Sequence, residues 1–225
     1  MGSAIGEVVP LGIGVAISPV PMVAVILMLL TSRAKSNAPA LLAGGIAALA
    51  VVVVVVLLIS SRTAVPTFDA QSTAALSARA LVGVLLLVLA WWQWRSRPKE
   101  GEEPKTPSWM RQIERVNPAL ALGFGALGLG VNPKDTPLAV LAGVAIAKAE
   151  LSPAESAVTL AVFIAIATAS VAAPVALYFA LGDRAEVTLN GWKTWLTKNN
   201  ATVMTVLFLV FGVVLVVQGI RGHTS

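Results

Sequence analysis

Long apolar stretches separated by short polar segments run through most of the chain. Apolar runs long enough to cross about 30 Å of hydrocarbon, which takes about 20 helical residues, occur at six places. They lie near 7–31, 38–60, 75–94, 118–148, 155–180 and 200–220. This pattern predicts an all-α integral membrane protein with six transmembrane helices. Since no soluble segment is long enough for a second domain, we expect residues 1–225 to form one transmembrane domain.

Two of the predicted spans, the first and the fourth, are interrupted by prolines. The fourth contains the polar insert Asn132-Pro133-Lys134-Asp135-Thr136-Pro137. The apolar parts on its two sides, 119–131 and 136–147, would be about 20 Å and about 18 Å long as helices, so neither crosses alone. The first span has a similar break at Ser18-Pro19-Val20-Pro21. We therefore expect a broken helix or a re-entrant pair at each position.

Alignment of the two breaks on each other indicates a weak internal repeat. It places the glycines around 12–14 near those at 128–130. Repeat one then covers about 3–95, a cytoplasmic linker covers about 96–117, and repeat two covers about 118–222. Because each repeat has an odd number of spans, the second repeat must have the opposite orientation in the membrane, which is an inverted topology. We expect the two breaks to meet from opposite sides near the membrane midplane.

The charge distribution predicts an orientation. The chain is 57% hydrophobic and 12% charged with a formal net charge of +5, and its basic residues lie between the apolar runs, which favours a topological role over nucleic-acid binding. Apart from Lys134, eleven Lys and Arg follow spans one, three and five, and four lie on the other side. The positive-inside rule then places both termini outside the cytoplasm. The absence of cysteine excludes disulfides and thiolate metal sites.

The polar insert is the strongest candidate site, because an ionisable side chain at membrane depth costs at least about 2.5–3.5 kcal/mol. Asp135 is expected to carry a proton or a cationic group and Lys134 an anionic head group, with Asn132 and proline-freed carbonyls as polar contacts. The predicted substrate or coupling-ion site comprises Ser18, Pro19, Pro21, Asn132, Pro133, Lys134, Asp135, Thr136 and Pro137. The alternative is that Lys134 and Asp135 are a structural pair at a kink. We expect no metal site, no cofactor other than a coupling proton, and no catalytic cluster.

Other local patterns predict details of the fold. Ser152-Pro153-Ala154-Glu155 is a capping box with proline at the first helical position, so a helix should begin there. Pro174 is expected to kink the fifth span. The small residues Gly44, Gly45, Ala47 and Ala48 are expected to mark a close helix contact. In the linker, the apolar positions 109, 113 and 116 predict a short interfacial helix.

The chain resembles a known family in two motifs. Gly-x-Gly-Val-Ala-Ile-Ser-Pro-x-Pro covers Gly12 to Pro21, and Gly-Leu-Gly-Val-Asn-Pro-Lys-Asp covers Gly128 to Asp135. With six spans and a charged central linker, they resemble the peptidoglycolipid or sulfolipid addressing (GAP) family of actinobacteria, within the lysine-exporter superfamily. The resemblance implies a multi-pass protein of the bacterial plasma (inner) membrane, with the inverted three-plus-three fold, that moves glycolipids or other amphiphiles towards the cell envelope.

Several functions are compatible with this resemblance. The leading hypothesis is a secondary exporter of an amphiphile that works by alternating access, is not an enzyme, and contacts membrane lipids. The alternatives are an exporter of a small polar solute such as an amino acid, or a non-transporting accessory subunit that holds a lipid-synthesis partner protein through the linker. An intramembrane lipid-modifying enzyme is the weakest hypothesis, because the sequence shows no convincing cluster of nucleophile, base and acid at one depth. A homodimer through small-residue faces is left open.

Overall fold

The computed structural model describes residues 1–62, 73–95, 116–132 and 134–224, and every regular element among them is helical. The predicted interfacial helix at 109–116 falls almost wholly outside these residues. In chain order the elements are α1 (Gly2–Ala16), α2 (Pro19–Leu29), α3 (Ala34–Arg62), α4 (Thr73–Arg95), α5 (Pro118–Gly125), the π-helix η2 (Ala126–Gly130), α6 (Asp135–Lys148), α7 (Pro153–Ala167), α8 (Ala169–Leu181), the 3₁₀ turn η3 (Gly182–Arg184) and α9 (Ala185–Thr224).

The chain divides into two compact units. Unit 1 is formed by residues 1–63 and 106–194, and unit 2 by residues 64–105 and 195–225. Unit 1 therefore contains α1, α2, α3, α5, η2, α6, α7 and α8, whereas unit 2 contains α4 and the C-terminal part of α9. Both predicted breaks lie in unit 1.

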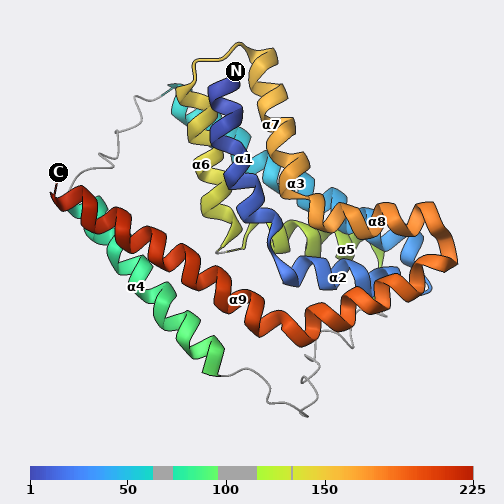
Figure 1. Ribbon diagram of the computed structural model, residues 1–225. Coiled ribbons are helices and arrows are strands. Elements are labelled where there is room, and N and C mark those ends of the chain that lie inside the picture. Colours follow the sequence, from blue (N-terminus) through green and yellow to red (C-terminus); the bar gives the residue numbers. More distant parts are fainter. Residues whose placement is uncertain (63–72, 96–115, 133, 225) are drawn as a thin grey trace. The chain divides into compact units, whose positions relative to one another are not determined.

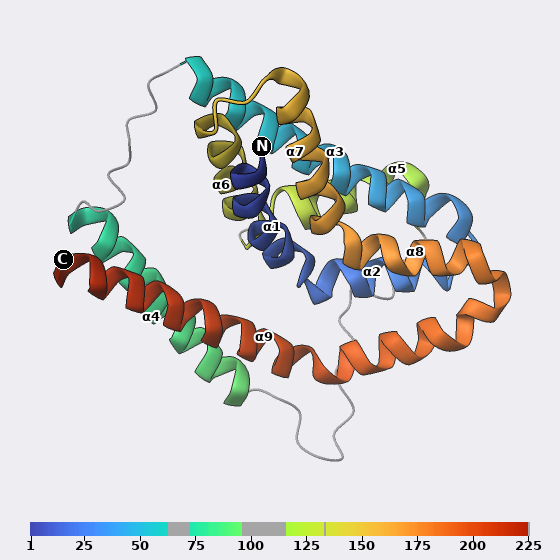
Figure 2. The same ribbon diagram turned by 45° about the horizontal axis from the view of Figure 1, so that its top comes forward.

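Unit 1 is built from two groups of helices that are joined by sharp bends. α1, α6 and α7 run side by side, as do α2 and α8 (Figures 1 and 2). The chain turns by 59° between α1 and α2 and by 71° between α7 and α8. The long helix α3 packs against α6 of the first group and α2 of the second, as well as against α5 and η2, so it ties the two groups together.

Small residues let α3 and α5 approach closely, as the sequence pattern predicted. A Cβ added at Gly44 would strike the backbone of Leu122, and one added at Gly125 would strike the backbone of Leu41. Helix pairs in membranes are held by such close packing, because lipid tails are as apolar as the helices themselves. The contact fixes α5 against α3 and so sets the direction in which η2 enters the second break.

Two helix starts follow directly from their capping residues. At α7 the Ser152 side chain accepts from the Glu155 N–H and the Glu155 carboxylate accepts from the Ser152 N–H, which confirms the predicted capping box. At α5 the Asn117 side chain accepts from the Leu120 N–H at 2.8 Å, with Pro118 at the first helical position. These caps define where both helices begin.

The fifth span bends at another residue than predicted, and the last helix is longer than its apolar run. The fifth span bends at Thr168, whereas Pro174 lies inside α8. The Thr168 hydroxyl donates to the Ile164 carbonyl at 2.7 Å, a back-bond that often bends helices. The last helix contains the apolar run predicted near 200–220, but it begins earlier, at Ala185.

The early start of α9 has a packing reason. Ala185 and Leu189 are fully buried and Leu196 is nearly so, which is a buried stripe at helical spacing. The polar residues between them lower the local hydropathy and hid this amphipathic stretch from a search for apolar runs. Trp195 lies on the exposed side of the same helix.

Unit 2 is a close helix pair. α4 and the C-terminal part of α9 run side by side in both views (Figures 1 and 2). A Cβ at Gly83 would lie 2.8 Å from the Gly212 carbonyl oxygen, and one at Gly212 would lie 3.0 Å from that of Gly83. Glycine is required on both helices at this crossing.

Among the described residues, one helix, Ala34–Ser60 within α3, is long and apolar enough to cross a membrane by itself. Three bent pairs pass the same test when each is taken as one span: α1 with α2, α7 with α8, and the two parts of α9, which brings the number to four. Shorter apolar helices lie at Ala80–Arg95 and Pro118–Gly130. An all-α membrane protein is thus confirmed, and the six-span inverted repeat stays a prediction.

Candidate functional site

The first break leaves backbone carbonyls without their helical donors. α1 ends at Ala16, and Ser18 is the extended residue that precedes α2. In a continuous helix the Ile17 carbonyl would accept from the N–H of residue 21, but Pro21 has no N–H. The Gly14 carbonyl also loses its donor, because the Ser18 N–H donates to the Ala16 carbonyl at 2.8 Å. Two carbonyl oxygens at the end of α1 therefore need donors from elsewhere.

The second break uses its own side chains to satisfy its backbone. η2 ends at Gly130, and α6 begins at Asp135. The Asn132 side-chain amide donates to the Gly128 carbonyl at 3.1 Å, and its side-chain oxygen accepts from the Lys134 N–H at 3.0 Å. Asn132 thus links the end of η2 to the start of α6.

Thr136 completes this local network. Its hydroxyl lies 2.9 Å from the carbonyl oxygens of both Gly130 and Asn132, so its single proton serves one or the other. The Asn132 carbonyl also accepts the N–H groups of Asp135 and Thr136 at 3.0 and 2.9 Å. The carbonyls of Gly128, Gly130 and Asn132 are therefore bonded within the break itself.

Lys134 connects the second break to the first. Its ammonium donates to the Gly14 carbonyl at 2.9 Å, to the Ile17 carbonyl at 2.7 Å and to Asp135 Oδ1 at 3.1 Å. These three bonds use all three ammonium protons. A cation is favourable at this position, since the C-terminal end of a helix carries partial negative charge. The two orphan carbonyls of α1 thus have a single donor, and it comes from more than a hundred residues away along the chain.

Asp135 completes the connection from the first turn of α6. It is fully buried, with no exposed surface, and forms an ion pair with Lys134. Its second oxygen, Oδ2, faces the Ser18 hydroxyl at 3.4 Å, which is long for a hydrogen bond between oxygens. The N-terminal end of α6 favours negative charge at this position. A buried carboxylate is tolerated only with such partners.

The structure brings most of the predicted site residues together. Ser18, Lys134 and Asp135 form one contact group across the two breaks, and Asn132 and Thr136 shape the second break around them. The two breaks meet as expected; their insertion from opposite sides of a membrane stays a prediction. The described prolines of the predicted site make no hydrogen bond with this contact group. Pro19 and Pro21 are buried in the first turn of α2, and Pro137 is exposed in α6. Pro133 lies outside the described residues.

Sequence reasoning missed the two residues that accept from Lys134. Gly14 and Ile17 act through backbone carbonyls, so their side chains give no signal of the role. For Ile17 a signal did exist, because a proline four residues later always removes the helical partner of a carbonyl. Gly14 carried no comparable signal.

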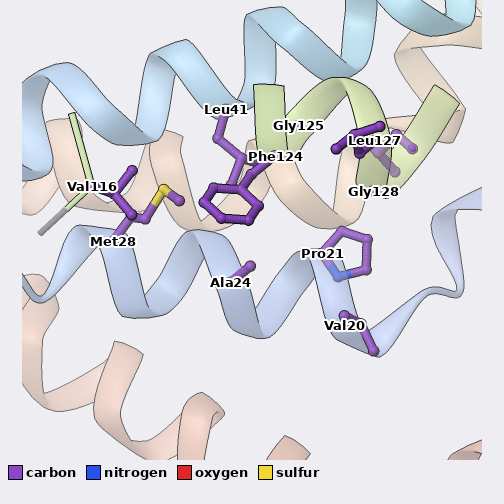
Figure 3. A pocket seen from close by; sticks show the side chains of 11 residues that line it. Val20, Pro21, Ala24, Met28, Leu41, Val116, Phe124, Gly125, Leu127 and Gly128 are labelled. Carbon is purple, nitrogen blue, oxygen red and sulfur yellow. The ribbon is translucent and has the colours of Figure 1, made fainter. Parts of the chain in front are cut away.

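An apolar cavity of about 410 Å³ lies next to the breaks, between α2, α3, α5 and η2 (Figure 3). Its lining consists of apolar side chains and glycines: Val20, Pro21, Ala24, Met28, Leu41, Val116, Phe124, Gly125, Leu127, Gly128 and Leu129. Volumes of this size are typical of small-molecule sites. Val20 and Pro21 follow Ser18 within the first turn of α2, so the cavity begins beside the polar contact group.

Comparison with known protein families gives a match that covers the whole of this site. The model of one family, described as "Sap, sulfolipid-1-addressing protein", matches residues 8–221. The chain belongs to this sulfolipid-1-addressing family. No curated protein and no solved structure matches the chain.

Membership in the sulfolipid-1-addressing family agrees with the resemblance seen in the two motifs. The match extends across both breaks and reaches into both compact units, so the Lys134–Asp135 contact belongs to the part of the chain that the family defines. The family and the apolar helices together indicate a membrane protein with a role in lipid addressing or export.

Proposed function

We propose that this chain is a secondary transporter that exports an amphiphile with an anionic polar part by alternating access. The observation that carries the proposal is the Lys134–Asp135 pair, a partly exposed ammonium on a fully buried carboxylate, which joins two broken helices at their ends. Broken helices whose ends face one another are typical of transporter binding sites, and an intramembrane ion pair is a functional site by default. The family description, which names a sulfolipid, supports an anionic amphiphile as the cargo.

The contacts support a specific cycle. In the observed state the Lys134 ammonium is saturated by two carbonyls of α1 and by Asp135, so it has no proton left for a head group. A proton that binds to Asp135 removes the negative partner, and Lys134 then pairs with the anionic group of the substrate. Loss of the proton on the cytoplasmic side lets the ion pair form again and expels the substrate on the outer side, so the proton moves in the direction opposite to the substrate. The Asp135 carboxylate and the anionic group of the substrate thus compete for the same ammonium.

This competition has a mechanical consequence. Lys134 is the only described donor to the Gly14 and Ile17 carbonyls, so its movement towards a substrate releases the end of α1. The 59° bend between α1 and α2 then becomes free to change. Substrate binding and helix movement are coupled through one side chain, which is what alternating access requires.

The proposal includes a topology. Four spans come from α3 and the three bent pairs, and α4 together with the α5–η2–α6 segment supplies two more. The third helices of the two repeats, α4 and the C-terminal part of α9, pair with each other in unit 2, as expected for two related halves. We propose both termini outside the cytoplasm of the plasma membrane, no enzymatic activity, and no cofactor other than the coupling proton.

The direct test is transport by the purified full chain in proteoliposomes with an imposed proton gradient. The probe is a fluorescent, sulfated, palmitoyl-bearing glycolipid whose leaflet is read by chemical quenching from outside. Asp135→Asn should abolish gradient-driven movement of the probe between leaflets, because an amide side chain does not bind a proton near neutral pH. Glu7→Gln is the matched control, since it makes the same chemical change at an exposed carboxylate of α1 and should leave transport unchanged.

Two results would contradict the proposal. Gradient-driven transport by Asp135→Asn at the wild-type rate would remove the proton role. Absence of any transport by the folded wild-type protein, together with stable capture of a lipid-synthesis protein, would favour the accessory-subunit alternative.

A further inference from the structure

We propose that the cavity between α2, α3, α5 and η2 binds one acyl chain of an amphiphile whose polar part lies at the Lys134–Asp135 contact. This deepens the proposed function and rests on it for the polar part alone. The site would divide the ligand into two portions, one apolar and one anionic, that are recognised by neighbouring but chemically distinct surfaces.

The lining determines which chemistry the cavity accepts. None of its eleven residues carries a polar or charged side chain, so a polar group placed there would lose its hydrogen bonds without compensation. Phe124 and Leu127 are half exposed, so the cavity opens on its surroundings instead of being sealed. Around a helix that lies in a membrane the solvent is lipid, and acyl chains are the apolar groups present there at the highest concentration.

The shape of the cavity favours an extended chain. Its lining follows α2 from Val20 to Met28, which is about 12 Å along the helix axis. Figure 3 shows Pro21 and Gly128 at one end, and Met28 and Val116 at the other. A chain laid between these ends runs parallel to α2.

The polar end of such a ligand falls at the breaks. Val20 and Pro21 directly follow Ser18 in the chain, and the Gly128 carbonyl accepts from the Asn132 side chain. Both segments that close this end of the cavity thus lead within one helical turn to the polar contact group. An amphiphile with its chain in the cavity presents its head group towards Lys134.

Because transfer of a chain from lipid to an apolar cavity gives no hydrophobic gain, packing and shape must hold it. This makes the site sensitive to filling. A Cβ at Gly128 would meet only the Pro21 ring, at 4.0 Å, so a side chain there has room and enters the cavity. A Cβ at Gly123, in α5 but outside the cavity lining, meets nothing within 4 Å. Gly128→Leu and Gly123→Leu are therefore a matched pair.

The test is photolabelling of the purified full chain in lipid nanodiscs. The probe is a sulfated lipid with one palmitoyl chain that carries a diazirine, and the labelled peptides are mapped by mass spectrometry. We expect labels on Val20–Met28 and Phe124–Leu129, displaced by unlabelled palmitoyl lipid but neither by its hexanoyl analogue nor by the free sulfated sugar. Gly128→Leu should reduce this labelling about tenfold. Gly123→Leu should leave it unchanged.

Three results would overturn the inference. The first is labelling that Gly128→Leu does not reduce. The second is labelling spread evenly over exposed apolar residues such as Leu81 and Val187, which would mean bulk lipid only. The third is disulfide dimerisation of Ala24→Cys in this cysteine-free chain, which would mean that a second copy covers the cavity.

The outcome is separable from that of the transport assay, because labelling is measured without a gradient. Cavity labelling by a protein that transports nothing would keep the acyl-chain site and remove the proposed function. Transport without cavity labelling would do the reverse.

Discussion

The two breaks have similar sequences but opposite roles in their contact. The first, around Ser18, contributes two carbonyl oxygens and one hydroxyl and carries no charge. The second, from Asn132 to Thr136, contributes an ammonium, a carboxylate and the side chains that bond its own carbonyls. The second break bonds the Gly128, Gly130 and Asn132 carbonyls with its own groups, whereas the first depends for two carbonyls on a lysine from the other half of the chain.

This difference indicates which element can move. A helix end whose carbonyls are bonded within its own turn keeps its shape when a neighbour shifts. A helix end whose carbonyls are bonded by one distant side chain changes as soon as that side chain leaves. We therefore infer that the second break is the fixed part of the contact and that the end of α1 is the part that responds. The following substitutions test this order of dependence.

The largest effect is expected from Lys134→Met, which keeps the length of the side chain and removes its charge. It leaves the buried Asp135 carboxylate unpaired and two α1 carbonyls without a donor. Removal of one partner of a buried ion pair costs about 3–5 kcal/mol. The free energy of unfolding, measured by denaturant titration in mixed micelles, should fall by this amount.

Two variants sharpen the result for Lys134→Met. Lys148→Met, at the exposed C-terminal end of α6, removes the same charge and should cost less than about 1 kcal/mol. The double variant Lys134→Met with Asp135→Asn should recover part of the loss, because no unpaired charge remains, while the carbonyls stay unsatisfied. Equal losses for Lys134→Met and Lys148→Met would mean that the contact does not hold the breaks together.

A smaller effect is expected from Thr136→Val, which removes a hydroxyl at nearly constant volume. The Gly130 carbonyl loses its described donor, whereas the Asn132 carbonyl keeps the N–H groups of Asp135 and Thr136. An unsatisfied buried polar group costs about 1–3 kcal/mol. Thr136→Ser keeps the hydroxyl and should restore most of the stability. Because the second break should loosen locally while Lys134 stays in place, hydrogen exchange should rise in residues 130–137 and remain low in residues 13–18. A matching rise in both segments would show that the first break does not depend on Lys134 alone.

Much of this arrangement was predictable because it follows from local rules. The two closely spaced prolines at 19 and 21 remove two backbone donors, which favoured a break there, although single prolines such as Pro174 lie inside helices. The capping box at Ser152 was predictable for the same reason, since its partners are three residues apart. The meeting of the two breaks was predictable only through the internal repeat, because two related halves place equivalent interruptions in equivalent positions.

The remainder depended on tertiary contacts that local patterns do not contain. The sequence placed Lys134 beside Asp135 but left open whether the ammonium would face a ligand, and its saturation by α1 carbonyls appears only when α1 and α6 are packed together. The bend at Thr168 was missed because threonine is an ordinary residue in a helix, and Thr159 makes the same bond to the preceding turn inside the unbroken α7. The apolar cavity was missed because its lining reads as helix-packing residues in the sequence.

The smallest effect is expected from Ser18→Ala, although Ser18 stands at the centre of the first break. Its hydroxyl makes no capping bond to α2, and its one contact, to Asp135, is 3.4 Å long. The loss in unfolding free energy should be less than about 0.5 kcal/mol, because long hydrogen bonds are weak. Ser152→Ala is the comparison, since that hydroxyl does cap α7 and its removal should cost about 1 kcal/mol. A loss for Ser18→Ala as large as that for Lys134→Met would show that the first break relies on its own polar side chain, and the asymmetry between the two breaks would then be wrong.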